Sequence, residues 1–301
     1  MVLKSKRSLI LIIICLLPLS GYSWDVDFPL LQSFTWFPYV KNTMLQAGED
    51  DLVVDLGYSN VYMFNYERDV VNDFDFASAA VAYRRSVSRN LTVELYLRTG
   101  LIYGGVMDKL IENFHGLIGN GEDGRGEFPR NTLNFTYKDV FSYDRAIAFA
   151  GPFVAGVLTR LYEGDYWSVN FRASLGIPLQ EKAGISSGKP FLSSGIIFLY
   201  RKNNLAVDMS LYGSFFKIPG WGDAGSTGSR MFFLNVRGAY KRIFGGLLFR
   251  SSPFREGDLS NPAWQIYAGF RISRHLSISM YEEIPPMDTV TDVSFRLTVE
   301  F

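Results

Sequence analysis

The sequence has almost no cysteine, and its single cysteine lies near the N-terminus. Cys15 stands inside an apolar segment, and a lipoprotein interpretation fails because the preceding residue is Ile14, where a lipobox requires a small residue. Once this N-terminal segment is removed, no thiol remains in the chain. Disulfides and thiolate metal sites are therefore excluded for the exported protein.

An excess of positive charge is also missing. The chain has 30 basic and 30 acidic residues, and removal of residues 1–23 takes away three basic and no acidic ones, which leaves 27 against 30. A nucleic-acid-binding protein needs a basic tract or patch to meet the phosphates. We therefore expect no nucleic-acid partner, and we also predict no cofactor and no metal.

Long apolar runs are scarce. Residues 9–19 are apolar but too short to span a bilayer, the basic residues Lys4, Lys6 and Arg7 precede them, and small residues follow at 20–23. This order predicts a secretory signal peptide over residues 1–23, with an uncleaved anchor as the alternative. No later stretch reaches the roughly 18 apolar residues of a transmembrane helix.

Aromatic residues are abundant, and many segments alternate between apolar and polar residues. The end of the chain shows this most clearly, because Val293, Phe295, Leu297, Val299 and Phe301 alternate with Ser, Arg, Thr and Glu. A period of two places one set of side chains on each face of a strand. Repeated segments of about ten such residues are typical of transmembrane β-barrels.

The connections between these segments alternate between tight turns and longer loops, as in barrels with short periplasmic turns. Residues 131–137 also alternate, and they form either a hairpin within a long loop or part of two further strands, which would make fourteen. We predict twelve strands, an even number, at 50–67, 74–87, 91–105, 152–162, 166–176, 188–201, 204–216, 229–241, 243–251, 261–272, 275–283 and 290–301.

The fold prediction is therefore an all-β protein: an antiparallel, up-and-down transmembrane β-barrel over residues 50–301 in the bacterial outer membrane, surrounded by its lipids. Residues 24–49 form either a periplasmic segment or a plug. Phe301 is similar to the C-terminal signal that the barrel-assembly machinery recognises, and we expect that machinery to be a partner.

The polar face of the strands carries many charges, which we expect to line the lumen. A pore lining that favours anions is one interpretation, and an internal network of ion pairs that fills a narrow barrel is the other. The predicted lumen residues are Arg84, Arg98, Arg160, Arg172, Arg237, Arg271 and Arg296, with Asp55, Glu94, Asp208 and Glu300.

The segment 106–129 has a different pattern. Apolar residues recur there at spacings of three and four, which predicts a short amphipathic helix in a long outer loop. The helix either constricts the barrel mouth, lies on the outer rim or is part of an ordered surface loop. Asp108, Glu112 and His115 would share one helix face, with Arg125 nearby, and this outer-loop constellation is a candidate acid–base or metal site.

Twelve-stranded outer-membrane phospholipases have a nucleophilic serine shortly after a histidine. No serine follows His115 until Ser142, so the nucleophile is missing from the local pattern. We therefore predict that the protein is not an enzyme, with a lipid-active hydrolase using His115 as the alternative.

Several short runs together resemble a bacterial outer-membrane β-barrel family known as domain of unknown function 3187. The resemblance covers nearly the whole exported chain, and it implies an outer-membrane barrel but no reaction or catalytic residue. The runs are Phe28–Leu30, Leu45–Gly48, Tyr58–Asn60, Met107–His115, Gly124–Arg125, Pro129–Asn131, Tyr281–Glu283 and Asp292–Phe295.

Three hypotheses for function follow. The first is a channel or transporter for small or amphipathic solutes, whose solute the sequence does not identify. The second is the lipid-active hydrolase, and the third is a structural or surface-interaction barrel with a plugged lumen.

Overall fold

The computed structural model describes residues 44–65, 70–109, 113, 131–137, 141–182, 185–216, 230–250, 263–283 and 293–301. The predicted signal peptide over 1–23 and residues 24–43 of the predicted periplasmic or plug segment lie outside these residues. Within the described ranges, no helix is long and apolar enough to cross a membrane.

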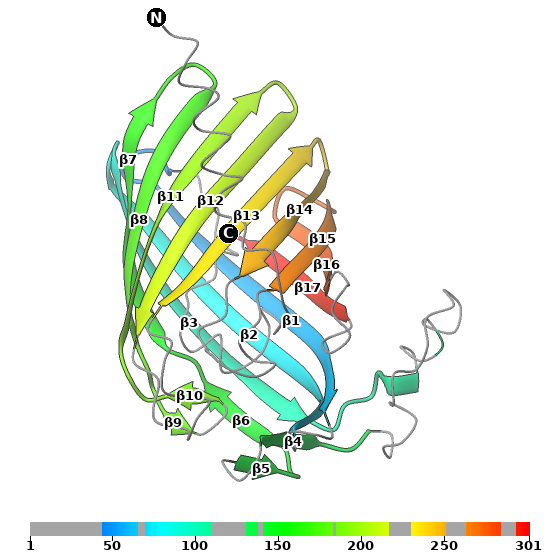
Figure 1. Ribbon diagram of the computed structural model, residues 1–301. Coiled ribbons are helices and arrows are strands. Elements are labelled where there is room, and N and C mark those ends of the chain that lie inside the picture. The colour runs from blue at the N-terminus through cyan, green and yellow to red at the C-terminus, as the bar shows by residue number, and fades with distance from the viewer. Residues whose placement is uncertain are drawn as a thin grey trace, which may run out of the picture.

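The wall of the molecule is a closed antiparallel barrel of twelve strands, as predicted (Figure 1). Each strand pairs with its neighbours in chain order, and β1 closes the barrel by pairing with both β2 and β17. The strands are β1 (Asp50–Asn65), β2 (Val70–Ser88), β3 (Leu91–Tyr103), β7 (Phe153–Glu163), β8 (Trp167–Ile177), β11 (Phe191–Lys202), β12 (Leu205–Phe216), β13 (Arg230–Tyr240), β14 (Ile243–Arg250), β15 (Ala263–Arg271), β16 (Leu276–Glu283) and β17 (Val293–Glu300).

The excursion between β3 and β7 contains three short strands, β4 (Asn134–Tyr137), β5 (Phe141–Tyr143) and β6 (Ile147–Ala150). β4 pairs with residues 70–73 of β2, beyond the point where β3 ends, and β5 pairs with β4. The alternating segment 131–137 therefore forms a hairpin, and the barrel has twelve strands rather than fourteen. β6 pairs with β3 and leads into β7 through Gly151–Pro152, where one extra residue interrupts the pairing.

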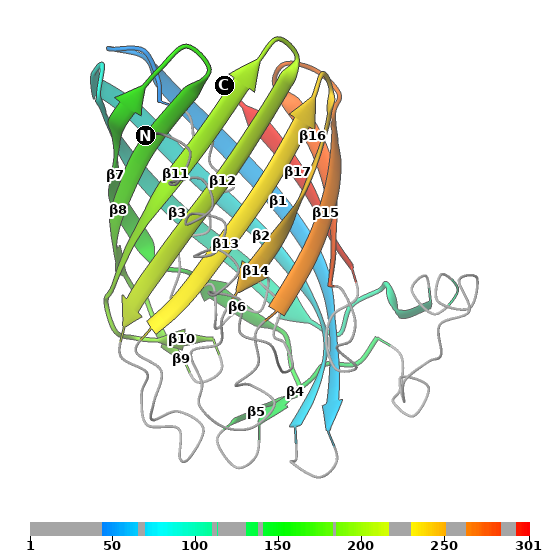
Figure 2. The ribbon, with the colours of Figure 1, turned by 45° about the horizontal axis from the view of Figure 1, so that its top comes forward.

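Short turns and long loops lie at opposite ends of the barrel (Figure 2). The short turns include Arg89–Asn90, Asn203–Asn204 and Lys241–Arg242. Phe301 lies at the same end, where its amide donates to the Leu52 carbonyl (2.8 Å) and its carbonyl accepts from the Leu52 amide (3.3 Å). The opposite end holds β4, β5 and the hairpin of β9 (Glu181–Lys182) and β10 (Ser186–Ser187). We call the two ends the turn end and the loop end.

Side chains alternate between a buried and an exposed face along the strands. In β3, for example, Thr92, Glu94, Tyr96 and Arg98 are buried, while the residues between them are exposed. Because the wall is one sheet thick, the buried set points into the barrel. Exposed large apolar residues cover the outward face, including Leu56, Val81, Leu95, Leu97, Leu101, Leu175, Ile196, Phe198, Leu211, Val236, Ile266, Ile278, Phe295 and Leu297. An apolar band of this extent is typical of a face that contacts lipid.

Aromatic side chains gather on the outward face near the turn end. Tyr162, Tyr166, Trp167 and Tyr240 are all at least half exposed. The Trp167 ring also packs against Tyr200 with centroids 4.6 Å apart. Such a girdle is typical of the boundary between the apolar core of a bilayer and its headgroups.

Inside the barrel, aromatic rings lie flat across glycines of neighbouring strands. A Cβ added to Gly176 of β8 would come within 2.0 Å of the Phe191 ring on β11. The same arrangement pairs Gly195 with Tyr212, Gly100 with Phe149, Gly246 with Tyr267 and Gly269 with Phe244. These glycines are therefore required for the close approach of a ring to the wall.

We predict that Gly176→Ala destabilises the barrel by about 1–3 kcal/mol, because the new methyl group forces the Phe191 ring to move. Gly238→Ala is the matched control, since a Cβ there meets no atom within 4 Å. Urea unfolding of the purified full chain in lipid vesicles measures both. Equal stability of the two variants would contradict the packing described here.

The candidate functional site is the barrel lumen

All the predicted lumen charges fall on the inward face of their strands, by the alternation of burial along each strand. Asp55, Arg84, Glu94, Arg98, Arg172 and Arg296 are at most 4% exposed. Arg160, Asp208, Arg237 and Glu300 are half-buried, and Arg271 is exposed at the turn end. The charges therefore divide into a buried set and a solvent-accessible set, which lie on different parts of the wall.

The Arg172 guanidinium on β8 is the centre of the buried set. Its Nε donates to Glu94 Oε2 (2.9 Å) and its Nη2 to Glu94 Oε1 (3.1 Å), and Nη1 donates to the Tyr212 hydroxyl (2.8 Å). Glu94 lies on β3 and Tyr212 on β12. Arg172 thus joins three strands that do not pair directly with one another.

Two glycines open the space for this network. Gly156 of β7 lies opposite Glu94 in the strand register, and Gly195 of β11 lies between Arg172 and Tyr212. Without side chains at these points, the long polar side chains pass over the intervening strands. A bidentate arginine–carboxylate pair is both strong and geometrically specific.

Two further ion pairs neutralise arginines on β2 and β17. Arg84 Nη2 lies 2.6 Å from Asp51 Oδ2 on β1. Arg296 Nη1 lies 2.8 Å from Asp55 Oδ2, and the Thr298 hydroxyl donates to Asp55 Oδ1 at the same distance. Asp51 was not among the residues predicted from the sequence, although it shares the alternation of Asp55.

Arg98 belongs to the same part of the lumen. Its Nη2 donates to the Ser78 hydroxyl (2.7 Å), and its guanidinium carbon lies 5.7 Å from the Phe76 ring centroid. On β1–β3 and β8, the interpretation as an internal network of paired charges therefore fits the observed contacts.

In a different part of the lumen, half-buried or exposed charged side chains lie beside aromatic ones, of which Tyr267 and Tyr281 are half-buried and Phe244 is buried. We call this part the basic–aromatic wall, and it consists of Arg201, Asp208, Arg237, Phe244, Tyr267, Arg271 and Tyr281, on β11–β16. The Arg237 guanidinium lies 4.5 Å from the Phe244 ring centroid. The Tyr267 and Tyr281 rings stack at 4.9 Å, and the Tyr267 hydroxyl donates to Asn235 Oδ1 at 3.0 Å.

Of this wall, the sequence predictions include Asp208, Arg237 and Arg271 but omit Arg201 and the aromatic residues. The signal was present in the alternation: Tyr267 is four residues before Arg271 on the same face. It was hidden because aromatic residues in barrels also occur on the outward face.

The loop end of the lumen carries an aromatic cluster. Phe135 of β4 packs against Phe74 (4.9 Å), Phe141 (4.8 Å) and Tyr143 (5.8 Å). The Lys182 ammonium of β9 lies 5.4 Å from the Tyr143 ring centroid, and burial raises the pKa of the Tyr143 hydroxyl. These contacts hold the β4–β5 hairpin against the end of β2.

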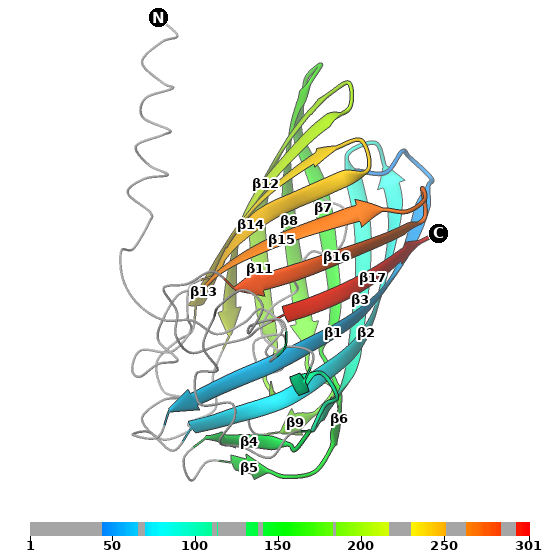
Figure 3. The ribbon, with the colours of Figure 1, turned by 90° about the vertical axis from the view of Figure 1, so that its right-hand side faces the viewer.

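The start of the β3–β7 excursion crosses the outward face of the barrel rather than its lumen. Asp75 Oδ2 accepts the Val106 amide (2.7 Å), and Asp75 also accepts from Tyr58 and from Asn60 Nδ2 (2.7 Å). These residues alternate with the inward ones on β1 and β2. Figure 3 shows the chain after β3 lying in front of β1 and β2, outside the wall. The sequence did not predict this site, since an outward carboxylate buried by a later segment has no local pattern.

Of the outer-loop constellation, the structure describes Asp108 alone, and its carboxylate accepts the Asn131 amide at 2.6 Å. Asp108, just after β3, is thereby joined to Asn131, just before β4. Glu112, His115 and Arg125 lie outside the described residues, as does most of the predicted amphipathic helix. In the part of the chain that the structure describes, no three His, Cys, Asp or Glu side chains are grouped to hold a metal ion.

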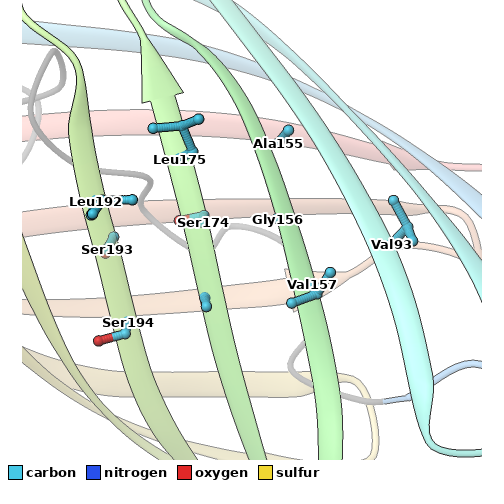
Figure 4. Close-up of a pocket in the computed structure, with 10 residues that line it drawn as sticks. Val93, Ala155, Gly156, Val157, Ser174, Leu175, Leu192, Ser193 and Ser194 are labelled. Atoms are coloured by element: carbon cyan, nitrogen blue, oxygen red, sulfur yellow. The ribbon is translucent and has the colours of Figure 1, made fainter.

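A groove of about 660 Å³ lies on the wall formed by β3, β7, β8 and β11 (Figure 4). Small residues, Ala155, Ala173 and Ser194, form its floor, and Val157 and Leu192 flank it. These side chains alternate with the buried inward ones, so the groove opens on the outward apolar face.

Comparisons with known proteins identify the family. A family model described as a protein of unknown function (DUF3187) matches residues 26–215. Since this is more than half of the chain, the protein belongs to that family, as the sequence resemblance suggested. No curated protein matches the chain.

A solved structure shares the fold. A crystal structure of the COG4313 outer membrane channel from Pseudomonas putida F1 aligns over 93% of this chain and 100% of its own, with 10% identity and a TM-score of 0.50. Salmonella typhi OmpF in complex with daunomycin aligns over 85% of this chain and 98% of its own, with 11% identity and a TM-score of 0.36. The fold is that of an outer-membrane β-barrel.

We predict that Glu94→Gln destabilises the barrel by about 3 kcal/mol, because it leaves the buried Arg172 guanidinium without its carboxylate. Glu163→Gln is the control, since Glu163 forms an exposed ion pair with Arg89 and its loss leaves stability nearly unchanged. Urea unfolding in lipid vesicles measures both. A Glu94→Gln barrel as stable as the control would show that the pair does not hold the strands together.

Proposed function

We propose that this protein is an outer-membrane channel for small or amphipathic solutes, with its water-filled path along the basic–aromatic wall. One observation carries the proposal. Asp208, Arg237, Tyr267, Ser277 and Ser279 point into the closed barrel and yet remain half-exposed. Inward side chains keep accessible surface only where they border space that water can enter, and polar, water-filled interiors are typical of porins.

Further support comes from the outside of the barrel and from the comparison. The apolar outward band and the aromatic girdle at the turn end suit a barrel embedded in a bilayer. The similar solved structure from Pseudomonas putida is described as an outer membrane channel. The buried ion pairs on β1–β3 and β8 keep the opposite side of the lumen narrow, which favours small solutes.

Planar-bilayer conductance of the purified full chain tests the proposal. We expect discrete conductance steps and, because three arginines face one aspartate on the basic–aromatic wall, a preference for anions. Arg237→Gln should move the reversal potential in a KCl gradient toward the cation side. Arg89→Gln, in an exposed turn, should leave it unchanged. Silent bilayers together with absent liposome swelling would reject the channel and favour the plugged barrel.

The absence of enzymatic activity stays a prediction. We expect wild type and His115→Ala to leave phospholipid and lipid A equally intact, since no serine follows His115 at close spacing. Mass spectrometry of the lipids after incubation measures this. Lipid hydrolysis by wild type that His115→Ala abolishes would instead support the lipid-active hydrolase.

A further inference from the structure

The basic–aromatic wall concentrates positive charge on one side of the lumen. Arg201 on β11 lies opposite Ala206, two residues before Asp208 on β12. Asp208 lies directly opposite Arg237 in the register of β12 and β13. Arg271 on β15 follows Gly269, which lies opposite Phe244. Three inward guanidinium groups, on β11, β13 and β15, thus lie on the same part of the wall as the Asp208 carboxylate. On the other side of the lumen, Arg84, Arg172 and Arg296 each have a carboxylate within 3 Å.

Aromatic faces adjoin these arginines. The Arg237 guanidinium stacks on the Phe244 ring, and that ring lies across Gly269, two residues before Arg271 on β15. The Tyr267 ring lies across Gly246 and stacks on Tyr281. Because both glycines lack a side chain, the rings lie against the wall. Phe244 is buried beneath Arg237, whereas Tyr267 and Tyr281 are only half-buried at the lumen. The wall therefore combines fixed cations with partly accessible aromatic rings.

We propose that the basic–aromatic wall is a binding site for amphipathic anions, namely carboxylates that carry an aromatic ring. Arg201, Arg237 and Arg271 receive the carboxylate, and Tyr267 and Tyr281 receive the ring. This inference names the class of solute that the channel would carry, and in that sense it rests on the proposed function. Binding at the site does not itself require that the barrel conducts.

The chemistry of these groups explains the choice of class. Guanidinium groups bind carboxylates through two parallel hydrogen bonds, in a geometry that ammonium groups do not match. Aromatic rings prefer stacked or edge-to-face contacts with other rings. A small anion without a ring meets only the arginines, and a neutral ring meets only the aromatic surface. A molecule with both parts uses both at once.

Equilibrium binding to the purified full chain in detergent micelles, by isothermal titration calorimetry, tests this site apart from conductance. The probes are benzoate, acetate as an anion without a ring, and benzyl alcohol as a ring without charge. We expect benzoate to bind wild type at least about tenfold more tightly than either of the others, since it gains both kinds of contact.

Four variants locate the site. Arg237→Gln removes the charge but keeps a polar side chain, and it should weaken benzoate about tenfold, because a charged hydrogen bond is lost. Arg271→Gln, at an exposed position that packing does not constrain, should act in the same direction. Tyr267→Leu, at a half-buried ring of the wall, should weaken benzoate about threefold and leave acetate unchanged. Arg89→Gln, in the β2–β3 turn, is the control and should bind benzoate like wild type.

Other outcomes overturn either the binding site or the channel, and they can be told apart. Benzoate that fails to bind wild type, or that binds Arg237→Gln and Arg271→Gln as it binds wild type, removes the site. Acetate that binds as tightly as benzoate refutes the aromatic part. If binding is absent but bilayers still conduct, the channel stands and the solute class is wrong. If binding is present and bilayers are silent, the site stands and the channel is wrong.

Discussion

The buried ion pair between Arg172 and Glu94 is the contact around which one side of the lumen is arranged. It crosses β7 over Gly156 and reaches Tyr212 across Gly195, so it ties together β3, β8 and β12. A slip of β8 by one residue would place Arg172 on the lipid-facing side, where an arginine costs about 2–4 kcal/mol at the bilayer midplane. The pair therefore specifies the register of this side of the barrel as well as stabilising it.

The need to pair buried charge also explains why the lumen has two unlike sides. On β1–β3, β8 and β17, Arg84, Arg172 and Arg296 are buried and have carboxylates, and apolar residues such as Phe76 on β2 and Leu158 on β7 are buried on the same side. On β11–β16, Arg201, Arg237 and Arg271 are half-buried or exposed, and the Arg237 guanidinium lies over an aromatic ring. A charged side chain that stays hydrated does not need a partner of opposite sign. A barrel of twelve strands can thus be packed on one side and wet on the other.

Much of this fold could be predicted from the sequence. The strand bounds fall within a few residues of the prediction, because a period of two in a bilayer-facing wall leaves a strong signal. The inward position of the arginines followed from the same period. The β4–β5 hairpin could not be distinguished from barrel strands, because residues 131–137 alternate as a wall strand does and only the free end of β2 decides their partner. The Asp75 site depends on a segment that folds back over the outside of the barrel. The basic–aromatic wall depends on whether each aromatic side chain faces the lumen or the lipid. Neither feature can be read from a local sequence pattern.

The central claim is that water reaches one side of the lumen and not the other. Single-cysteine variants in a chain with Cys15 replaced by serine test this directly, through their reaction with a membrane-impermeant methanethiosulfonate. We predict rapid modification of Ser277→Cys and Ser279→Cys on β16, which are half-exposed. Ser174→Cys on β8 and Ser59→Cys on β1, which are 6% and 2% exposed, should stay unmodified in the folded barrel. Equal reaction rates at all four positions would contradict the account.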